Sequence, residues 1–332
     1  MSFKINDIRP EGLMEAKKAF LEEDKEFLRS RKTQFVRVKC PACKSSERDV
    51  WGEKEGFIYD ICHNCNTVYM NPRAPEELMN KFYRQSKNYE FWNRYIFPAS
   101  EKIRKEKIFK PRAKKVVDYC KKNNLKGSSL LEIGSGFGTF CESIKEYNFF
   151  KEIIAVEPTP HLAETCRKRG FKVYELPVEQ LELSKESIEV IVNFEVIEHL
   201  FNPDLFIEYC IKYLKINGLF ICTCPNIESL GPLVLREKAK VIDHEHINYF
   251  NPASLSYLLE KKGLEILEVS TPGELDLELL KEALQEDLTL QKYNPFFTYL
   301  IFSSNNNIFD DFQNFLKRNN LSSHMWILAR KR

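Results

Sequence analysis

Four cysteines occur in two pairs with the spacing of metal ligands. Cys40 and Cys43 have two residues between them, as do Cys62 and Cys65, and 18 residues separate the pairs. Two tight turns of this kind can present four thiolates to one tetrahedral Zn²⁺ ion. Because four thiolates leave no coordination position open, we predict a structural zinc rather than a catalytic one. Residues 49–61 alternate in polarity and turn through Gly56 like a hairpin, so we predict a zinc ribbon over residues 36–72.

The segment DHEHINYF, residues 243–250, contains side chains that could move a proton. His244 and His246 flank Glu245, and histidine changes charge near neutral pH. The segment lies between an apolar strand pattern and a helical pattern over residues 252–263, which predicts a loop on the substrate side. A structural role for the two histidines, such as capping the following helix, stays open. We do not favour a metal site in this segment, because the surrounding sequence offers no clear further ligand.

A glycine-rich loop follows a strongly apolar strand in LLEIGSGFGTF, residues 130–140. Gly134, Gly136 and Gly138 permit backbone angles and close ligand approach that a Cβ atom would obstruct. Their spacing differs from the dinucleotide fingerprint, and the loop lacks the Gly-Lys-Ser/Thr ending of a phosphate-binding loop. Glu157 ends the next apolar strand, where an acid can reach the ribose hydroxyls of an adenosine cofactor. We therefore predict a nucleoside-cofactor site here.

The elements that must position these residues alternate between strand and helix. Strand patterns occupy about 130–133, 153–157, 171–175, 188–194 and 219–226, and helical patterns occupy about 139–147, 161–169 and 203–215. This alternation predicts a parallel sheet, in which ligands lie beyond the carboxyl ends of the strands. That edge would collect the glycine loop, Glu157, Glu179 and residues 193–199.

The remaining patterns predict four segments. Residues 1–35 form an N-terminal helical segment, 36–72 the ribbon, 73–126 a helical bridge that kinks or restarts at Pro111, and 127–332 the cofactor-binding domain. Strands over 264–270 and 324–331 complete the sheet. The residues between them, about 271–320, form an insertion, which we expect to be a substrate cover or a dimer surface.

Composition narrows the classes of function. With 332 residues of which 43% are hydrophobic, the chain can bury one large core and a smaller one. Its net charge of +2 gives no basic field for nucleic acid. The sequence shows neither a signal-peptide core nor an apolar run long enough for a membrane span, so we expect a cytoplasmic protein whose ten cysteines are reduced or bind metal.

The glycine loop, together with Glu132 before it, resembles motif I of class I S-adenosylmethionine-dependent methyltransferases. The segments VNFEVIEHL, GLFICTCPN and DHEHINYF are similar to those of methyltransferases of surface-polysaccharide and sugar modification. A paired-cysteine module in front of such a domain resembles sugar C-methyltransferases that act on nucleotide-linked deoxysugars. The resemblance implies a Rossmann-like α/β fold with a seven-stranded sheet whose last strand is antiparallel.

The resemblance also implies roles for individual residues. Gly134, Gly136 and Glu157 would hold S-adenosylmethionine, and residues near Glu179 and Glu195 would close around it. In the sugar C-methyltransferases the segment matching DHEH is Tyr-His-Glu-His, with its second histidine as base and its glutamate on the substrate. These two roles fall on His246 and Glu245, while Asp243 stands where the family has tyrosine.

The leading hypothesis is therefore methyl transfer from S-adenosylmethionine to a sugar, either nucleotide-linked or a precursor of a surface glycan. One alternative is an RNA methyltransferase whose ribbon binds nucleic acid, although NFEV stands where such enzymes have an Asn/Asp-Pro-Pro-Tyr/Phe motif. The other is a non-catalytic protein with a cofactor-binding fold, against which the glycines and Glu157 argue. The acceptor, the methylated atom and a homodimer stay open.

Overall fold

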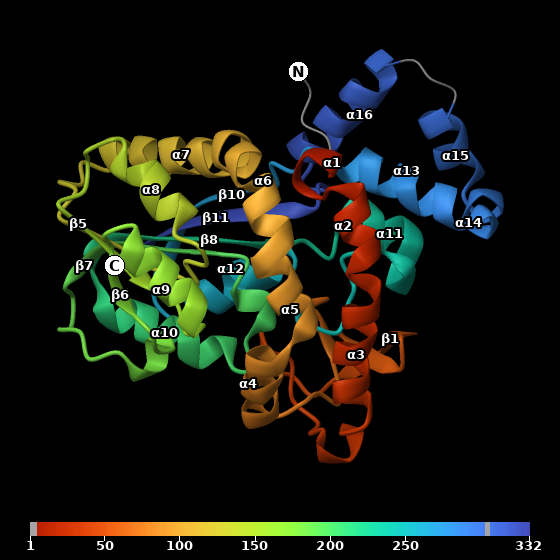
Figure 1. Ribbon diagram of the computed structural model, residues 1–332, viewed down its shortest axis with the longest axis horizontal. Helices are drawn as coiled ribbons and strands as arrows, with labels where there is room; N and C mark the ends of the chain where they lie inside the picture. Colours follow the sequence, from red (N-terminus) through yellow and green to blue (C-terminus); the bar gives the residue numbers. More distant parts are fainter. Residues whose placement is uncertain (1–4, 303–305) are drawn as a thin grey trace.

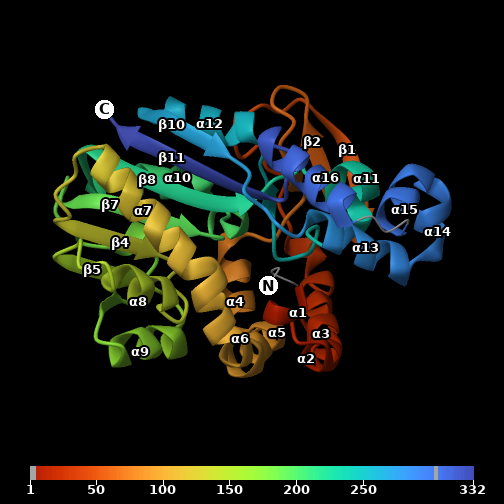
Figure 2. The same ribbon diagram turned by 90° about the horizontal axis from the view of Figure 1, so that it is seen from above.

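The computed structural model describes residues 5–302 and 306–332. A seven-stranded sheet with helices on both faces forms one side of the molecule. The N-terminal helices, a second sheet of four strands and the helical insertion gather at the carboxyl edge of the parallel strands (Figures 1 and 2). None of the helices in these two ranges combines the length and apolar character that a bilayer crossing requires.

The large sheet has the strand order β10-β11-β8-β7-β4-β5-β6. Within it only β11 is antiparallel to its neighbours, which confirms the seven-stranded, Rossmann-like expectation. The strands are β4 (Ser129–Ile133), β5 (Glu152–Val156), β6 (Lys172–Tyr174), β7 (Ile188–Phe194), β8 (Leu214–Pro225), β10 (Leu264–Ser270) and β11 (His324–Lys331).

Every residue of β4 and β7 is buried, because helices cover both faces of the sheet. One face packs against α7 (Lys110–Lys122) and α8 (Thr139–Lys145), with α9 (Pro160–Lys168) beside α8. The other face packs against α10 (Pro203–Tyr213) and α12 (Pro252–Lys261). The strand predicted from residue 219 starts earlier, at Leu214, directly after α10 ends.

The helical bridge, predicted over residues 73–126, is more continuous than the sequence predicted. After α4 (Glu76–Gln85), one helical run extends from Lys87 to Lys122 through α5 (Lys87–Phe91), α6 (Phe97–Arg104) and α7. The sequence predicts a kink or restart at Pro111, and there the π turn η3 (Lys105–Phe109) ends and α7 begins at Lys110 without a break in the helical run. A second π turn, η2 (Trp92–Ile96), likewise ends two residues before a proline, Pro98. A proline lacks an N–H group and crowds the preceding turn, and a wider turn relieves that crowding without ending the helix.

The ribbon sheet has the order β1-β2-β3-β9, with β1 (Arg48–Lys54), β2 (Phe57–Cys62) and β3 (Val68–Met70). The predicted hairpin is β1 and β2. Its fourth strand, β9 (Asn248–Tyr249), comes from residues 243–250 of the large domain, which we call the DHEH segment. The ribbon sheet therefore extends beyond residues 36–72.

Short helices make up the rest of the molecule. The N-terminal segment contains α1 (Ile5–Ile8), α2 (Glu11–Ala16), α3 (Lys18–Arg29) and the 3₁₀ turn η1 (Lys32–Gln34), and α11 (Leu230–Leu235) with η6 (Arg236–Lys238) precedes the DHEH segment. The insertion contains α13 (Asp276–Glu286), α14 (Leu288–Tyr293), α15 (Pro295–Phe302) and α16 (Asn306–Arg318). Its role as a cover or a dimer surface stays a prediction, and residues 303–305 of it lie outside the described residues.

Candidate active site

The glycine loop connects the carboxyl end of β4 to α8. Gly134 has φ +75°, and a Cβ atom there would lie 2.5 Å from Cγ2 of Val196, so only glycine fits this packing. Gly136 has φ +54°, and a Cβ atom there would have no heavy atom within 4 Å. Close packing therefore accounts for the first glycine, whereas the second leaves open space that a ligand can approach.

Glu157 joins the end of β5 to this loop. Its buried carboxylate accepts hydrogen bonds from the N–H groups of Gly136, at 2.8 Å, and Thr159, at 2.9 Å. Burial raises the pKa of Glu157, and these two N–H donors oppose the rise by stabilising the carboxylate. The acid predicted from spacing therefore lies against the predicted glycine loop.

Two other predicted acids lie in different surroundings. Glu132 is buried in β4 and accepts a hydrogen bond from the thiol of Cys141 at 2.9 Å. Burial raises its pKa to about 8, so this carboxyl group keeps its proton near neutral pH. Glu179 is half-buried in the 3₁₀ turn η4 (Val178–Gln180), where burial and, to a smaller extent, Glu76 raise its pKa. Their roles at the cofactor stay predictions.

Glu195 lies in a cluster of charges that the sequence did not predict. Its carboxylate is 3.0 Å from Nε2 of His324 and 3.6 Å from Nη2 of Arg112, and it accepts a hydrogen bond from the hydroxyl of Thr223. Burial raises the pKa of Glu195, but His324 and Arg112 lower it more, to well below its usual range. These partners hold the carboxylate ionised at the ends of β7 and β8, and contact with the cofactor stays a prediction.

In the DHEH segment, His244 is packed among aromatic side chains. It is 1% exposed, with ring centroids 6.3 Å from Phe57 and 5.7 Å from Phe82. Neither ring nitrogen has a hydrogen-bond partner among the described residues, and burial lowers the pKa of the ring. The side chain that caps α12 is Asn251, so neither histidine serves as the helix cap considered above.

Glu245 and His246 are better placed for chemistry. Glu245 accepts a hydrogen bond from the side-chain amide of Asn88 at 2.8 Å, and burial, followed by Asp243, raises its pKa to about 7. Burial lowers the pKa of His246, but the carboxylates of Asp243 and Glu198 outweigh that effect and raise it to about 9. With these neighbours alone, His246 carries a proton near neutral pH, which opposes its action as a base.

Asp243, which stands where the resemblance described above led us to expect a tyrosine, shapes the loop. Its carboxylate accepts hydrogen bonds from the N–H groups of Glu245, at 2.9 Å, and His246, at 2.8 Å. It also lies 3.3 Å from Nδ1 of His246. Asp243 therefore fixes the backbone of the loop and is the largest of the influences that raise the pKa of His246.

The sequence analysis placed residues 193–199 at this edge but assigned no role to Glu198 and His199, which lie beside His246. Glu198 and His199 form part of the 3₁₀ turn η5 (Ile197–His199), directly after β7. The rings of His199 and His246 have centroids 4.7 Å apart, and Glu198 is fully buried. An adjacent Glu-His pair at the carboxyl end of a strand was a usable signal, because the sheet edge brings that turn to the substrate-side loop.

The ribbon supports this loop directly. The hydroxyl of Tyr59 donates to the carbonyl of Asp243 at 2.7 Å, and the N–H of Met70 donates to the carbonyl of Ile247 at 3.0 Å. The side-chain amide of Asn251 donates to the carbonyl of Cys65 at 2.9 Å. Folding of the ribbon and placement of the DHEH segment are thus physically coupled.

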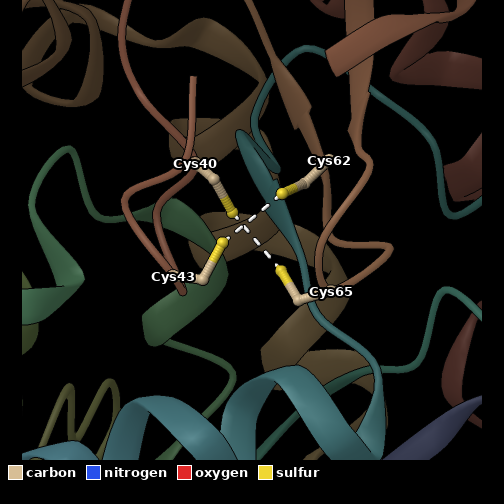
Figure 3. Close-up of side chains that lie close together, drawn as sticks. All are labelled: Cys40, Cys43, Cys62 and Cys65. Carbon is tan, nitrogen blue, oxygen red and sulfur yellow. Dashed lines mark hydrogen bonds between the residues drawn. The ribbon is translucent and has the colours of Figure 1, made fainter. Parts of the chain in front are cut away.

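The four predicted metal ligands of the ribbon converge, as Figure 3 shows. The sulfur of Cys40 lies 3.5 Å from that of Cys65, and the sulfur of Cys43 lies 3.4 Å from that of Cys62. A tetrahedral site with metal–sulfur bonds of about 2.3 Å needs sulfur–sulfur separations of about 3.8 Å. The four thiols can therefore take a tetrahedral ion with small side-chain shifts.

Comparisons with known proteins identify a methyltransferase domain in this chain. A family model described as a methyltransferase domain matches residues 102–269, just over half of the chain. The match includes the glycine loop, Glu157 and the DHEH segment, and it excludes the four cysteines and the insertion.

Two curated relatives and one solved structure illustrate the similarity. A "Probable S-adenosylmethionine-dependent methyltransferase" of Mycolicibacterium smegmatis is 33% identical over 142 residues, which are 42% of this chain and 53% of that protein. A ubiquinone biosynthesis O-methyltransferase of Agrobacterium fabrum is 32% identical over 156 residues, 43% of this chain and 62% of that protein. The chain spans about half the length of the curated relatives it matches. The crystal structure of an S-adenosylmethionine-dependent methyltransferase from Thermotoga maritima has 19% identity and a TM-score of 0.47, and the similarity covers 74% of this chain and all of that one.

Proposed function

The chain belongs to the methyltransferase domain family, and on this premise we propose that it transfers a methyl group from S-adenosylmethionine to a hydroxyl oxygen of a sugar. One observation supports the proposal above the others. The glycine loop and the DHEH segment, which lie more than 80 residues apart in sequence, both pack on the turn after β7: Val196 packs against Gly134, and the N–H of Ile247 donates to the carbonyl of Glu198 at 3.0 Å.

The residues at the glycine loop fit the cofactor. The open space at Gly136 admits a ligand close to the backbone, and the carboxylate of Glu157 lies beside it with lone pairs left for ribose hydroxyls. When bound, S-adenosylmethionine supplies a methyl group on a positively charged sulfur. Gly134, Gly136, Gly138 and Glu157 would hold it, with Glu132, Glu179 and Glu195 as the further acids expected from the resemblance.

The helical bridge closes over this edge and would exclude water. Phe97 of α6 packs on Phe137 of the glycine loop with ring centroids 5.3 Å apart, and the side chain of Asn93 hydrogen-bonds His161 at 3.0 Å. Since a methyl transfer mainly requires donor and acceptor to be held close, this cover would contribute by fixing both reactants.

Two lines support the acceptor we propose. The resemblance of the paired-cysteine module and the DHEH segment to sugar methyltransferases supports a sugar. The relatives named ubiquinone biosynthesis O-methyltransferases support oxygen as the methylated atom. In this arrangement Glu245 would hold the acceptor, and His246 would act on the proton of its hydroxyl group.

A product assay tests the proposal. The protein is incubated with a pool of nucleotide sugars and isotopically labelled S-adenosylmethionine, and products are identified by mass spectrometry. We expect one sugar to gain a labelled methyl group on oxygen. Transfer to a parallel RNA sample alone would replace this proposal by the RNA alternative, and absence of transfer from a bound cofactor to either pool would favour the non-catalytic alternative.

The ribose contact is tested by calorimetry of S-adenosylmethionine binding. Replacement of Glu157 by alanine should weaken binding by roughly 1.5 to 3 kcal/mol, the range for hydrogen bonds to a charged group. The matched control is Glu164→Ala, since Glu164 lies on α9, is half-exposed and pairs with Arg167 and Lys168. Equal affinity of both variants would remove Glu157 from the ribose role.

We also propose that Cys40, Cys43, Cys62 and Cys65 bind one structural Zn²⁺. The convergence of their sulfurs and the absence of a free position in a four-thiolate site support this assignment. The localisation expected from the sequence, the cytoplasm, stays a prediction.

A further inference from the structure

Three side chains from two segments converge beside the DHEH loop with the composition of a metal site. Glu198 and His199 come from η5, and His246 comes from the loop before β9. One potential ligand atom from each lies within 4.8 Å of the other two. Sequence alone did not favour a metal here because two of the three ligands lie more than 40 residues before the DHEH segment.

Glu198 has a buried carboxylate without a hydrogen-bond donor in the described part of the chain. Its side chain is fully buried, and neither carboxylate oxygen has a hydrogen-bond donor among the described residues. A buried carboxylate without a partner costs several kcal/mol unless it is neutralised by a proton or by a cation. Two imidazoles lie beside Glu198 and could coordinate the same cation. A bound cation therefore accounts for all three side chains, whereas a proton on Glu198 accounts for only one of them.

Backbone carbonyls hold one ring nitrogen of each histidine. Nδ1 of His199 lies 3.1 Å from the carbonyl oxygen of Glu245, and Nδ1 of His246 lies 3.1 Å from that of Val241. In the neutral form of each ring, which is the form that binds a metal ion, donation from Nδ1 to a backbone carbonyl leaves Nε2 with its lone pair available. Metal-binding histidines are usually held in this way by a partner on the other ring nitrogen.

A second cluster of similar composition differs in its carboxylates, which have hydrogen-bond donors. Asp24, His244 and Glu245 also lie close together. The carboxylate of Asp24, however, already accepts hydrogen bonds from the hydroxyl of Ser86 and from the N–H groups of Lys87 and Asn88 at the start of α5. Asp24 is thereby accounted for as a helix cap, whereas Glu198 has no such role.

We propose that Glu198, His199 and His246 bind a divalent transition metal ion, such as Mn²⁺, Fe²⁺ or Zn²⁺, on the acceptor side of the site. Two imidazoles and one carboxylate suit these ions, and three protein ligands leave positions open for other oxygen donors. In the proposed reaction, the hydroxyl group of the acceptor substrate is an oxygen ligand that could fill one of these open positions. Coordination of the acceptor hydroxyl by the ion rests on the proposed function, whereas the metal site itself does not.

The position of the site suits that role. Val196, two residues before Glu198, packs against Gly134 of the glycine loop, so the ion would lie close to the cofactor edge. A hydroxyl group bound to a divalent cation loses its proton to water more readily. Its oxygen then forms a bond to the methyl carbon as the carbon–sulfur bond breaks, and sulfur keeps the electron pair. In this arrangement His246 is a metal ligand and need not remove the proton itself.

Mn²⁺ titration of the full-length, zinc-loaded protein tests the site. Mn²⁺ prefers oxygen and nitrogen ligands to four thiolates, so it will not replace ribbon zinc. With electron paramagnetic resonance as the readout of free Mn²⁺, we expect one bound Mn²⁺ per chain. Glu198→Gln and His199→Ala should each lose this ion. Glu268→Gln is the matched control, because Glu268 lies on β10 and pairs with Lys115.

The outcomes separate this inference from the proposed function. Affinity for S-adenosylmethionine, measured on the same variants, reports whether they are folded. Absence of a Mn²⁺ site in the unaltered protein, or equal Mn²⁺ binding by folded Glu198→Gln and the control, would overturn the metal site whatever the methyl transfer assay shows. A bound Mn²⁺ that Glu198→Gln abolishes would support the site even if no acceptor were methylated.

Discussion

Replacement of His246 by glutamine should lower methyl transfer by roughly 100- to 10,000-fold, the range for loss of a group that acts on the transferred proton. The reason is its position, since His246 lies in the acceptor-side loop beside Glu198 and His199. The affinity for S-adenosylmethionine should change little, because His246 is not among the groups at the glycine loop. Steady-state kinetics and calorimetry on the same variant measure the two quantities.

His244→Gln provides the comparison within the same loop. Because His244 is buried between aromatic rings, its replacement should mainly lower the thermal unfolding temperature, with a smaller effect on turnover. If turnover is lost in His244→Gln and retained in His246→Gln, the match to the sugar methyltransferases is shifted by two residues.

Added Mn²⁺ separates the two roles considered for His246. A base that acts without a metal ion predicts turnover that does not depend on Mn²⁺. A metal ligand predicts turnover that rises with Mn²⁺ occupancy in the unaltered protein and does not respond to it in His246→Gln.

Removal of the ribbon zinc should have the largest effect on folding. In the double variant Cys40→Ser, Cys62→Ser we expect no zinc in the four-cysteine site and an unfolded ribbon. Binding of structural zinc supplies roughly 10 to 16 kcal/mol to small zinc-dependent modules. Because β3 pairs with β9 and Tyr59 bonds the carbonyl of Asp243, methyl transfer should also fall. Metal analysis, hydrogen exchange of residues 36–72 and kinetics measure these effects.

Cys120→Ala is the control for thiol content, since Cys120 is buried in α7 away from the four-cysteine cluster. It should keep the ribbon zinc of the unaltered protein. A folded double variant that still binds zinc at the ribbon would contradict the assignment. If the double variant loses zinc while its ribbon amides stay protected from hydrogen exchange and its activity is full, the ion is dispensable for the active site.

Local patterns determined much of this structure. The buried strands β4 and β7, the glycine turn and the alternation of strands and helices follow from apolar periodicity and glycine, which act within about ten residues. The pairs of cysteines likewise predicted their own convergence, because each pair is a local turn and the hairpin between them is short. The spacing from the glycine loop also placed Glu157 correctly at the loop, since parallel strands end at one edge.

Only the tertiary structure decided the surroundings of the candidate acids and histidines. The sequence could not show that β9 would become the fourth strand of the ribbon sheet, because that pairing joins residues about 180 positions apart. Nor could it show that Arg112, Thr223 and His324 would surround Glu195. The grouping of Glu198 and His199 with His246 has the same origin. Charge and ligand chemistry depend on distances of a few ångströms between distant segments, and those distances exist only after the sheet edge, the ribbon and the helical bridge have packed together.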